Sequence, residues 1–203
     1  MKDIPAEYRR RYDLFLQEIA KRLQALIIGH LEGTPHIDRI SARAKSPDHF
    51  SHKAQSTDPD TGRIRYANPL TDIQDQLGAR VIVFYRDDVA TVCEVVGRYF
   101  RKIEERELVP DSQWAFGYFG QHFILGVPRD VIPEGISVEQ VPRFFELQIK
   151  TLFQHAWSEA NHDLGYKARA PLSPDQERRL AYTAAQAWGA DRVFAELYAE
   201  LHT

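Results

Sequence analysis

The stretch "FELQIKT" (residues 145–151) alternates apolar and polar side chains from one residue to the next. Successive side chains of a β-strand point to opposite faces, so this alternation predicts a strand with one face in a core. The core face would carry Phe145, Leu147 and Ile149. The other face would carry Glu146, Gln148 and Lys150, and it is either exposed to solvent or the floor of a site.

Composition limits the kind of site to which this strand could belong. The chain has 203 residues, 43% of them hydrophobic and 27% charged, which is enough for one substantial core with helical extensions. A net charge of -3 argues against coating nucleic acid by bulk electrostatics. The single cysteine, Cys93, fits a reducing compartment, and no apolar run reads as a signal peptide or a membrane span. We therefore expect a cytoplasmic enzyme or binding domain with no membrane contact.

The order of predicted elements indicates an α+β fold. Helical spacing runs through residues 8–31, "HIDRISARAK" (36–45) alternates as a strand, and a short helix begins at Ser46. A short helix ending near Gly78 and a buried strand over 79–85 follow, and then a helix over 87–107. Two more strands are predicted in 116–128 and 143–150, and two helices begin at capping-box patterns, Thr151 with Gln154 and Ser173 with Gln176. The sum is a mixed or antiparallel sheet of about four to five strands flanked by helices.

The strand "DRISARAK" (38–45) places Arg39, Arg43 and Lys45 on one face. Three neighbouring cations repel one another unless they bind an anion such as a polyphosphate. Taken alone, the pattern fits a solvated strand face better than a site.

Two further segments carry candidate ligand-binding groups. In "DQLGAR" (75–80), Asp75 could hold a divalent metal and Arg80 could meet a phosphate, or both could be ordinary surface charges. In "FGYFGQH" (116–122), Tyr118 and His122 share a face between glycines, so a flat base could approach the ring, although the segment also fits a plain bulged strand.

The helix "HAWSEANHDLGYK" (155–167) brings His155, Glu159 and His162 near one face. This spacing could be taken for a metal site. A further strong ligand motif is lacking, so we expect these side chains to bond to neighbouring loops instead.

These segments, taken in order, resemble the synthetase domain of the RelA/SpoT family, which includes the small alarmone synthetases. The resemblance covers about residues 37–167 and rests on an Arg-x-Lys strand (43–45), an Asp-x-x-Gly-x-Arg turn (75–80), a Gly-Tyr loop ending in His (117–122) and a Glu-x-Gln-Ile-Lys-Thr strand (146–151). It implies a nucleotidyltransferase-like synthetase domain with helical extensions at both ends of residues 1–203.

The resemblance also implies a reaction and a role for each candidate residue. Enzymes of this family transfer the β,γ-pyrophosphate of ATP to a ribose 3′-hydroxyl and release AMP. Asp75 and Glu146 would hold Mg²⁺, with Glu146 also the candidate base. The ATP-binding residues would be Arg39, Arg43, Lys45 and Arg80. The acceptor-binding residues would be Tyr118, His122, Gln148 and Lys150.

The sequence departs from the family pattern mainly in the segment that the resemblance assigns to acceptor recognition. "SQWAF" (112–116) stands where guanosine-specific members carry Lys and Asn, His49 and Gly120 each replace a usual Ser, and Trp114 and Phe116 could either widen a stacking platform or pack in the core. The leading hypothesis is a guanine nucleotide acceptor. The alternatives are a toxic relative, with an antitoxin partner, that modifies an adenine nucleotide or the tRNA 3′-CCA end, and a non-catalytic nucleotide-binding regulator. The long terminal helices could pair between chains in a homo-oligomer.

Overall fold

A five-stranded mixed sheet organises the computed structural model, which describes residues 3–58, 60–108, 116–117, 120–167 and 171–202. The strands are β1 (Ile37–Ala44), β2 (Leu77–Val83), β3 (Lys102–Leu108), β4 (Gly120–Gly126) and β5 (Phe144–Thr151). The helices are α1 (Ile4–Arg11), α2 (Gln17–His30), α3 (Pro47–Ala54), α4 (Pro69–Asp72), α5 (Arg86–Tyr99), α6 (Leu152–Lys167) and α7 (Pro174–His202). Shorter turns are the π-helical η1 (Tyr12–Leu16) and the 3₁₀ turns η2 (Gln74–Gln76), η3 (Arg129–Val131) and η4 (Val138–Gln140). The predicted α+β class is confirmed.

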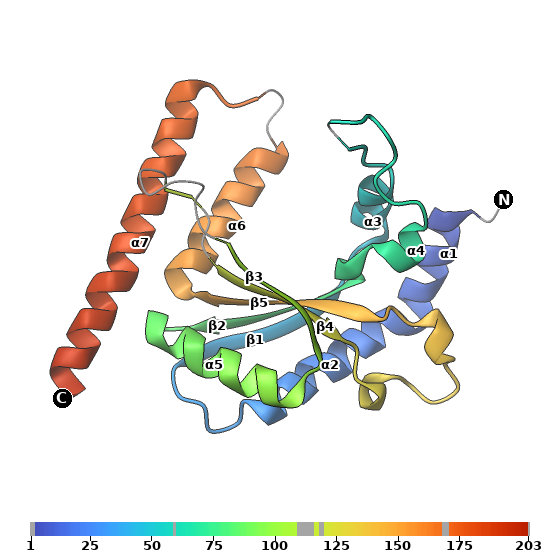
Figure 1. The fold of residues 1–203 in the computed structure, drawn as a ribbon, viewed down its shortest axis with the longest axis horizontal. Coiled ribbons are helices and arrows are strands. Elements are labelled where there is room, and N and C mark those ends of the chain that lie inside the picture. The colour runs from blue at the N-terminus through green and yellow to red at the C-terminus, as the bar shows by residue number, and fades with distance from the viewer. Residues whose placement is uncertain (1–2, 59, 109–115, 118–119, 168–170, 203) are drawn as a thin grey trace.

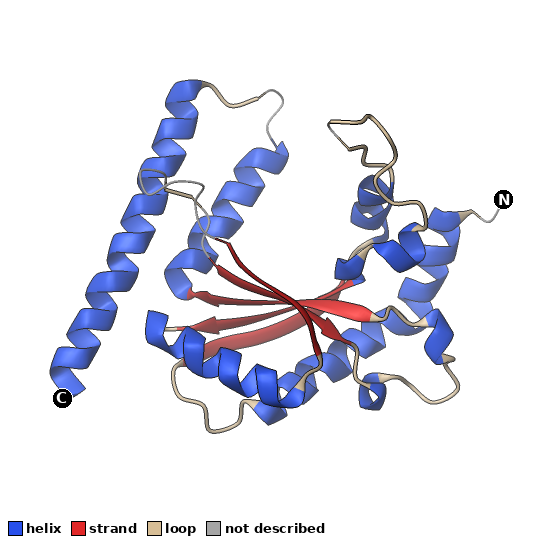
Figure 2. Cartoon of the chain, in the orientation of Figure 1, coloured by secondary structure: helices blue, strands red, loops and turns tan. Residues whose placement is uncertain are grey.

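The strand order is β1-β2-β5-β4-β3, with β5 in the centre. Strand β5 runs parallel to β2 and antiparallel to β4, while β1–β2 and β3–β4 are antiparallel pairs. Helices α2 and α5 lie on one side of the sheet, and α6 lies on the other side near one end, with α3 and α4 near the opposite end (Figures 1 and 2). One sheet face is therefore covered by α2 and α5, and the other is flanked by helices at its two ends.

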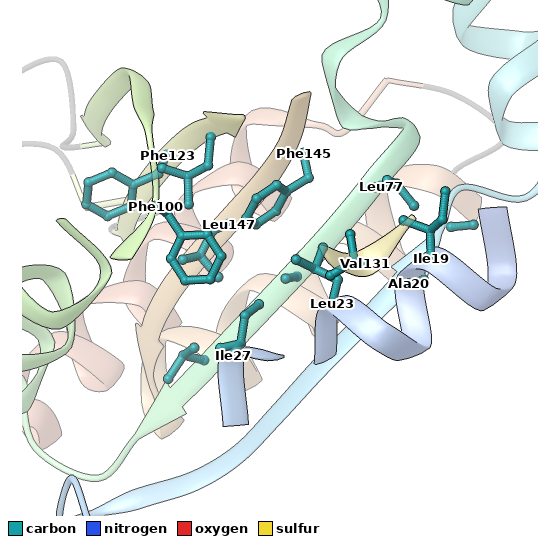
Figure 3. Packing of buried hydrophobic residues seen from close by; sticks show 14 of the residues in the cluster. Ile19, Ala20, Leu23, Ile27, Leu77, Phe100, Phe123, Val131, Phe145 and Leu147 are labelled. Atoms are coloured by element: carbon teal, nitrogen blue, oxygen red, sulfur yellow. The ribbon is translucent and has the colours of Figure 1, made fainter. Parts of the chain in front are cut away.

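The predicted alternation of β5 is confirmed by its burial. Phe145, Leu147 and Ile149 are fully buried, and Figure 3 shows the first two among side chains from α2 such as Leu23 and Ile27. Each side chain of this size contributes about 1.5–3 kcal/mol on burial. The core face of the central strand thus fixes the direction of its polar side chains.

The start of α6 confirms one predicted capping box. The backbone N–H of Thr151 donates to Gln154 Oε1 over 3.0 Å, and the backbone N–H of Gln154 donates back to Thr151 Oγ1 over 3.1 Å. Ser173 and Gln176 form the same reciprocal pair at the start of α7. No helix in the described part of the chain is long and apolar enough to cross a membrane.

The prediction of one helix over 87–107 is wrong in its second half. Helix α5 ends at Tyr99, and residues Lys102–Leu108 form β3, an edge strand that pairs with β4 alone. Buried apolar side chains at helical spacing, Val92 and Val96, stop there. The following charged run has no apolar face to bury as a helix, whereas an edge strand leaves both of its faces and one edge in water.

The prediction of a helix ending near Gly78 also needs correction. Helix α4 ends at Asp72, a 3₁₀ turn covers Gln74–Gln76, and Gly78 lies inside β2, paired with Arg43 on one side and Glu146 on the other. A Cβ built at Gly78 would meet nothing within 4 Å. Gly78 therefore leaves space on the sheet face between Arg43 and Glu146.

Helix α7 is attached to the central strand by a buried carboxylate. Thr151 Oγ1 donates to Asp191 Oδ2 over 2.7 Å, and Asp191 is only 4% exposed. Burial raises the pKa of Asp191 to about 6, against the smaller opposing effects of the Thr151 hydrogen bond and of Arg86. Ionisation of Asp191 therefore destabilises the folded state relative to the unfolded chain.

We predict that Asp191→Asn stabilises the protein near pH 7.5. Between about pH 4 and pH 6 the Asp191 carboxyl is ionised in the unfolded chain but still protonated in the folded chain, so its contribution to the free energy of unfolding falls as pH rises through this window and stays low above it. The gain should be about 2–3 kcal/mol, from a pKa difference of about two units. Urea unfolding across pH 4–8 measures it. Asp175→Asn, exposed at the start of α7, is the control, and an Asp191→Asn profile that overlays the wild type would contradict the assignment.

Candidate active site

The sheet face opposite α2 and α5 carries a set of charged and polar side chains, here called the polar face. Strand pairing places them in rows, since directly paired residues project to the same side. Arg43, Gly78 and Glu146 form one row; Arg80, Gln148 and His122 form the next; Arg39 and Lys150 fall in a third. The structure thus brings together on one face most of the residues predicted for the site from four separate segments.

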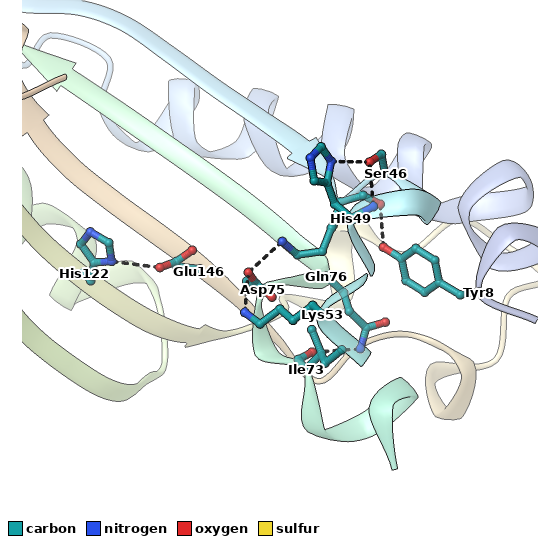
Figure 4. A network of polar contacts seen from close by, with 10 residues as sticks. Tyr8, Ser46, His49, Lys53, Ile73, Asp75, Gln76, His122 and Glu146 are labelled. Atoms are coloured by element: carbon teal, nitrogen blue, oxygen red, sulfur yellow. Dashed lines mark hydrogen bonds and ion pairs between the residues drawn. The ribbon is translucent and has the colours of Figure 1, made fainter. Parts of the chain in front are cut away.

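Asp75 lies at the end of the polar face, just before β2, and it binds two lysines. Its Oδ2 is 3.0 Å from Lys45 Nζ and 2.9 Å from Lys53 Nζ, and Figure 4 shows Lys53 reaching it from α3. The other oxygen, Oδ1, is buried and has no hydrogen-bond partner among the described residues. Burial tends to raise the pKa of Asp75, but the two lysines outweigh it and lower the pKa below its ordinary value.

Two hydrogen bonds of the Lys45 backbone fix the place from which its side chain projects. The backbone N–H of Lys45 donates to Gln76 O over 2.8 Å, and Tyr8 Oη donates to Lys45 O over 2.8 Å. Gln76 is itself held by donating from Nε2 to Leu70 O and Ile73 O. Helix α1 and the turn before β2 therefore position Lys45 against Asp75.

Glu146 faces Asp75 from the central strand. Its Oε1 lies 2.9 Å from His122 Nδ1 on β4, and Figure 4 shows this contact next to the Asp75 carboxylate with its lysines. Burial and the nearby charge of Asp75 raise the pKa of Glu146, yet the His122 contact prevails and the pKa is lowered. Two partly buried acids are thus held ionised side by side, each by its own set of partners.

Helix α6 covers the other end of the polar face. Arg80 Nη1 lies 2.7 Å from Glu159 Oε1, and Lys150 Nζ donates to Ser158 Oγ over 3.1 Å. Lys150 is 3% exposed, and burial, followed by the charge of Arg80, lowers its pKa to about 8. The expectation that Glu159 bonds to a loop is wrong, because its partner is on β2.

The cations differ in how they are engaged. Arg43 is exposed and forms no ion pair within the described part of the chain, whereas Arg39 pairs with Asp38 at 3.0 Å. Gln148 Oε1 is buried without a hydrogen-bond partner among the described residues. A guanidinium and an amide oxygen on this face are therefore available to a ligand.

Lys53 was missed from the sequence as a site residue, and Glu159 was named without its partner Arg80. Lys53 lies on α3, three residues after the buried Phe50. This helical spacing places Lys53 near the inward side of α3, and it was the only sequence signal for a contact with the sheet. Glu159 had no local signal toward Arg80, which is about eighty residues away in the chain. Both make contacts that only the tertiary fold creates.

The segment 112–122, which the family resemblance assigns to the acceptor and which is here called the acceptor loop, is described only in part. Tyr118 and Trp114 lie outside the described residues, so the structure does not test them. Phe116 is described, and its ring meets Trp188 of α7 edge to face at 5.9 Å, with the Arg192 guanidinium 5.0 Å from the Trp188 ring centre. Phe116 therefore packs against α7, while still 38% exposed.

The donor set of the polar face suits a hard divalent cation shared with a ligand. In residues 3–58, 60–108, 116–117, 120–167 and 171–202, no three side chains of His, Cys, Asp or Glu are grouped so as to hold a metal. Two carboxylates, one with a buried free oxygen, fit Mg²⁺ bound together with substrate phosphates, which is its usual mode in phosphate-handling sites.

Comparison with known proteins gives consistent matches. The family model described as "Region found in RelA / SpoT proteins" matches residues 42–171. The curated GTP pyrophosphokinase YjbM of Bacillus subtilis is 25% identical over 142 residues, which cover 68% of this chain and 64% of that relative's length.

Solved structures extend the fold match to nearly the whole chain. A GTP pyrophosphokinase family protein from Streptococcus pneumoniae superposes with a TM-score of 0.75 at 23% identity, covering 99% of this chain and 96% of that one. The small alarmone synthetase 1 of Bacillus subtilis bound to its product pppGpp gives 0.69 at 20% identity, with 98% and 96% covered.

We predict that Lys53→Met raises the pKa of Asp75. With one of its two cations gone, the carboxylate keeps the burial that disfavours its charge but loses part of what offsets it. NMR titration of the side-chain carboxyl carbon measures the shift. Lys102→Met removes an exposed lysine from β3 and should leave Asp75 unchanged. An unaltered Asp75 titration in Lys53→Met would show that Lys45 alone holds the carboxylate.

Proposed function

We propose that this chain, which belongs to the RelA/SpoT family, is an enzyme that transfers the β,γ-pyrophosphate of ATP to the ribose 3′-hydroxyl of a guanine nucleotide. The relative named as a GTP pyrophosphokinase and the neighbour with bound pppGpp support the acceptor class. One observation carries the proposal: two acids of lowered pKa lie near each other beside a sheet face that also presents Arg43, which has no ion pair among the described residues. A polyphosphate and a hydroxyl nucleophile need such a combination.

The cations would bind the donor nucleotide. Arg43 is exposed and free of ion pairs among the described residues, so its guanidinium can take a phosphate in two parallel hydrogen bonds or stack on adenine. Lys45 and Lys53 neutralise Asp75 without ligand, and they would exchange this contact for phosphate oxygens as the nucleotide enters. The space at Gly78 lies between Arg43 and Glu146, where the reacting phosphate would fit.

Glu146 is suited to take the proton of the acceptor hydroxyl. It is ionised at neutral pH, its lowered pKa keeps it so despite burial and the nearby charge of Asp75, and Oε1 is engaged by His122. In the step, the acceptor 3′-oxygen forms a bond to the β-phosphorus, the bond from that phosphorus to the α-phosphate oxygen breaks, AMP leaves, and the hydroxyl proton passes to Glu146. Asp75 and Glu146 would hold Mg²⁺, which when bound neutralises phosphate charge and polarises the phosphorus.

The acceptor would lie toward α6 and the acceptor loop. Lys150 and Gln148 project from β5 beyond Glu146, and Arg80 is anchored by Glu159 beside them. The positive charge of Lys150 and the amide of Gln148 would hold the acceptor's phosphates or hydroxyls. Arg80 would contact the ATP phosphates beside them, and Tyr118 would stack on the acceptor base. Phe116 packs against Trp188, which favours an anchoring role for this aromatic residue over a widened stacking platform for an RNA end.

The function is tested by incubating the protein with labelled ATP, Mg²⁺ and, separately, GDP, GTP, AMP, ADP and tRNA. We expect labelled pyrophosphate on GDP or GTP, with weaker discrimination against adenine acceptors than a typical alarmone synthetase shows, because "SQWAF" lacks the usual polar groups. Label on AMP, ADP or tRNA alone would support the toxic alternative, and no transfer to any acceptor would support a binding protein.

The same assay tests the two acids. Asp75→Asn and Glu146→Gln should each lower the rate on the order of a hundredfold or more while preserving the fold by circular dichroism. Glu200→Gln, exposed near the end of α7, is the matched control. A folded variant with near-normal turnover would remove that acid from the mechanism.

We predict that the acceptor kcat/KM falls as pH rises through about 8. Lys150 has a pKa lowered to about 8, so it is charged below this pH and loses its proton above it, and with the proton it loses its attraction for acceptor phosphate. Lys150→Arg keeps its charge and should remove the fall, while Lys150→Met should lower kcat/KM about tenfold or more at pH 7 and also flatten the profile. A fall above pH 8 that persists in both variants would assign it to another group.

We also predict that Gly78→Val separates stability from activity. A Cβ at Gly78 meets no heavy atom within 4 Å, and a β-branched residue suits a strand, so we expect the melting temperature not to fall. The valine would occupy the space between Arg43 and Glu146, and turnover should drop at least tenfold. Gly97→Ala on α5, also without a neighbour within 4 Å, is the control. Full activity of Gly78→Val would place the reacting phosphate elsewhere.

A further inference from the structure

A hollow of about 550 Å³ lies at the end of the sheet where β4 ends and β3 and β5 begin. Its lining comes from the end of α5, the start of β3, the segment from Gly126 to Ile132, and the residues from Val138 to Phe144. None of the residues placed in the candidate active site lines it. Its volume is in the range of pockets that take one small organic molecule.

Three arginines line this hollow, and the backbone pairing of the strands brings them together. Gly126 N–H donates to Arg101 O over 2.9 Å on one side of β4, and Val127 N–H donates to Arg143 O over 3.0 Å on the other. Arg129 opens η3 directly after this segment, and the buried Val131 anchors that turn in the core. Arg101, Arg129 and Arg143 therefore come from three neighbouring chain segments to one place.

None of the three guanidinium groups has an ion pair or a side-chain hydrogen bond within the part of the chain that the structure describes. Other arginines of the chain do find acids close by, as Arg10 and Arg11 do at Glu7. Three cations around one hollow repel one another, and a bound anion would offset that repulsion.

The walls of the hollow are largely apolar. Phe100 and Val141 are buried in them, and Phe144 and Ile132 are partly buried. Three apolar or aromatic side chains around it remain exposed: Tyr99 at 58%, Ile103 at 41% and Val138 at 56%. The Tyr99 ring is held by stacking on His30, with centroids 4.1 Å apart. An inorganic anion would leave this apolar surface in water, whereas an organic one would cover it.

From this combination we propose that the hollow binds a small organic anion, in which a phosphate or carboxylate group meets Arg101, Arg129 and Arg143 and an apolar or aromatic body packs on Tyr99, Ile103 and Val138. The site is independent of the pyrophosphate-transfer function proposed above. Failure of either proposal leaves the other standing, since they use different residues.

The test measures the binding of four probes to the full chain by isothermal titration calorimetry: 1-naphthyl phosphate, 1-naphthoate, neutral 1-naphthol and inorganic phosphate. At least one naphthyl anion should bind tenfold or more tightly than both naphthol and inorganic phosphate. The stronger of the two anions identifies the head group. Equal binding of inorganic phosphate and the naphthyl anions would overturn the proposal, because it would mean a plain anion site.

Variants locate the bound probe. The double variant Arg129→Ala/Arg143→Ala should weaken binding tenfold or more, and Val138→Trp, which fills the hollow without changing its charge, should do the same. Arg98→Ala, exposed on α5 and paired with Glu94, and Arg43→Met on the polar face should change the dissociation constant less than twofold. Loss of binding in Arg43→Met alone, or unchanged binding in both hollow variants, would overturn the proposal.

Discussion

The pairing of β5 along both of its edges is the constraint on which the rest of the structure depends. Because β2 and β4 hold its register, and because Phe145, Leu147 and Ile149 must stay in the core, Glu146, Gln148 and Lys150 can only project to the opposite face. A slip of one residue would bury the charges and expose the core. The same pairing that stabilises the sheet therefore sets Glu146 beside Gly78 and Lys150 in the row of Arg39.

Charge compensation around the polar face makes this arrangement tolerable without ligand. Asp75 is near enough to Glu146 to disfavour its ionisation, and both acids lie partly out of water. Two lysines and a histidine offset this cost, and Glu159 does the same for Arg80. Each of these ion pairs contains a charged side chain that a ligand of opposite charge could bind instead of its present partner. The lysines and Arg80 could bind an anion such as a polyphosphate, and the two acids could bind a cation.

Sequence patterns predicted those elements whose two faces differ. Strands β1 and β5 alternate because one face is buried, and the helices begin at capping residues that act locally, so both kinds of signal lie within a few residues. Strand β3 was missed because its charged side chains carry no such contrast at a sheet edge. The pairs Lys53–Asp75 and Arg80–Glu159 were missed because each joins segments that only the folded chain brings together.

The position of β5 in the sheet also has a consequence for how the chain acquires its fold. The pairs β1–β2 and β3–β4 are each made from neighbouring strands in sequence, but β5 is the last strand to be synthesised and it must enter between them. Until residues 144–151 have left the ribosome, the edges of β2 and β4 that it will cover remain unpaired and open to wrong partners. Joining β5 to β2, which lies far before it in the sequence, is also slow. Nascent chains that stop before residue 144 should therefore be the aggregation-prone species, and they lack Glu146 as well, so the polar face and the sheet are completed in the same event.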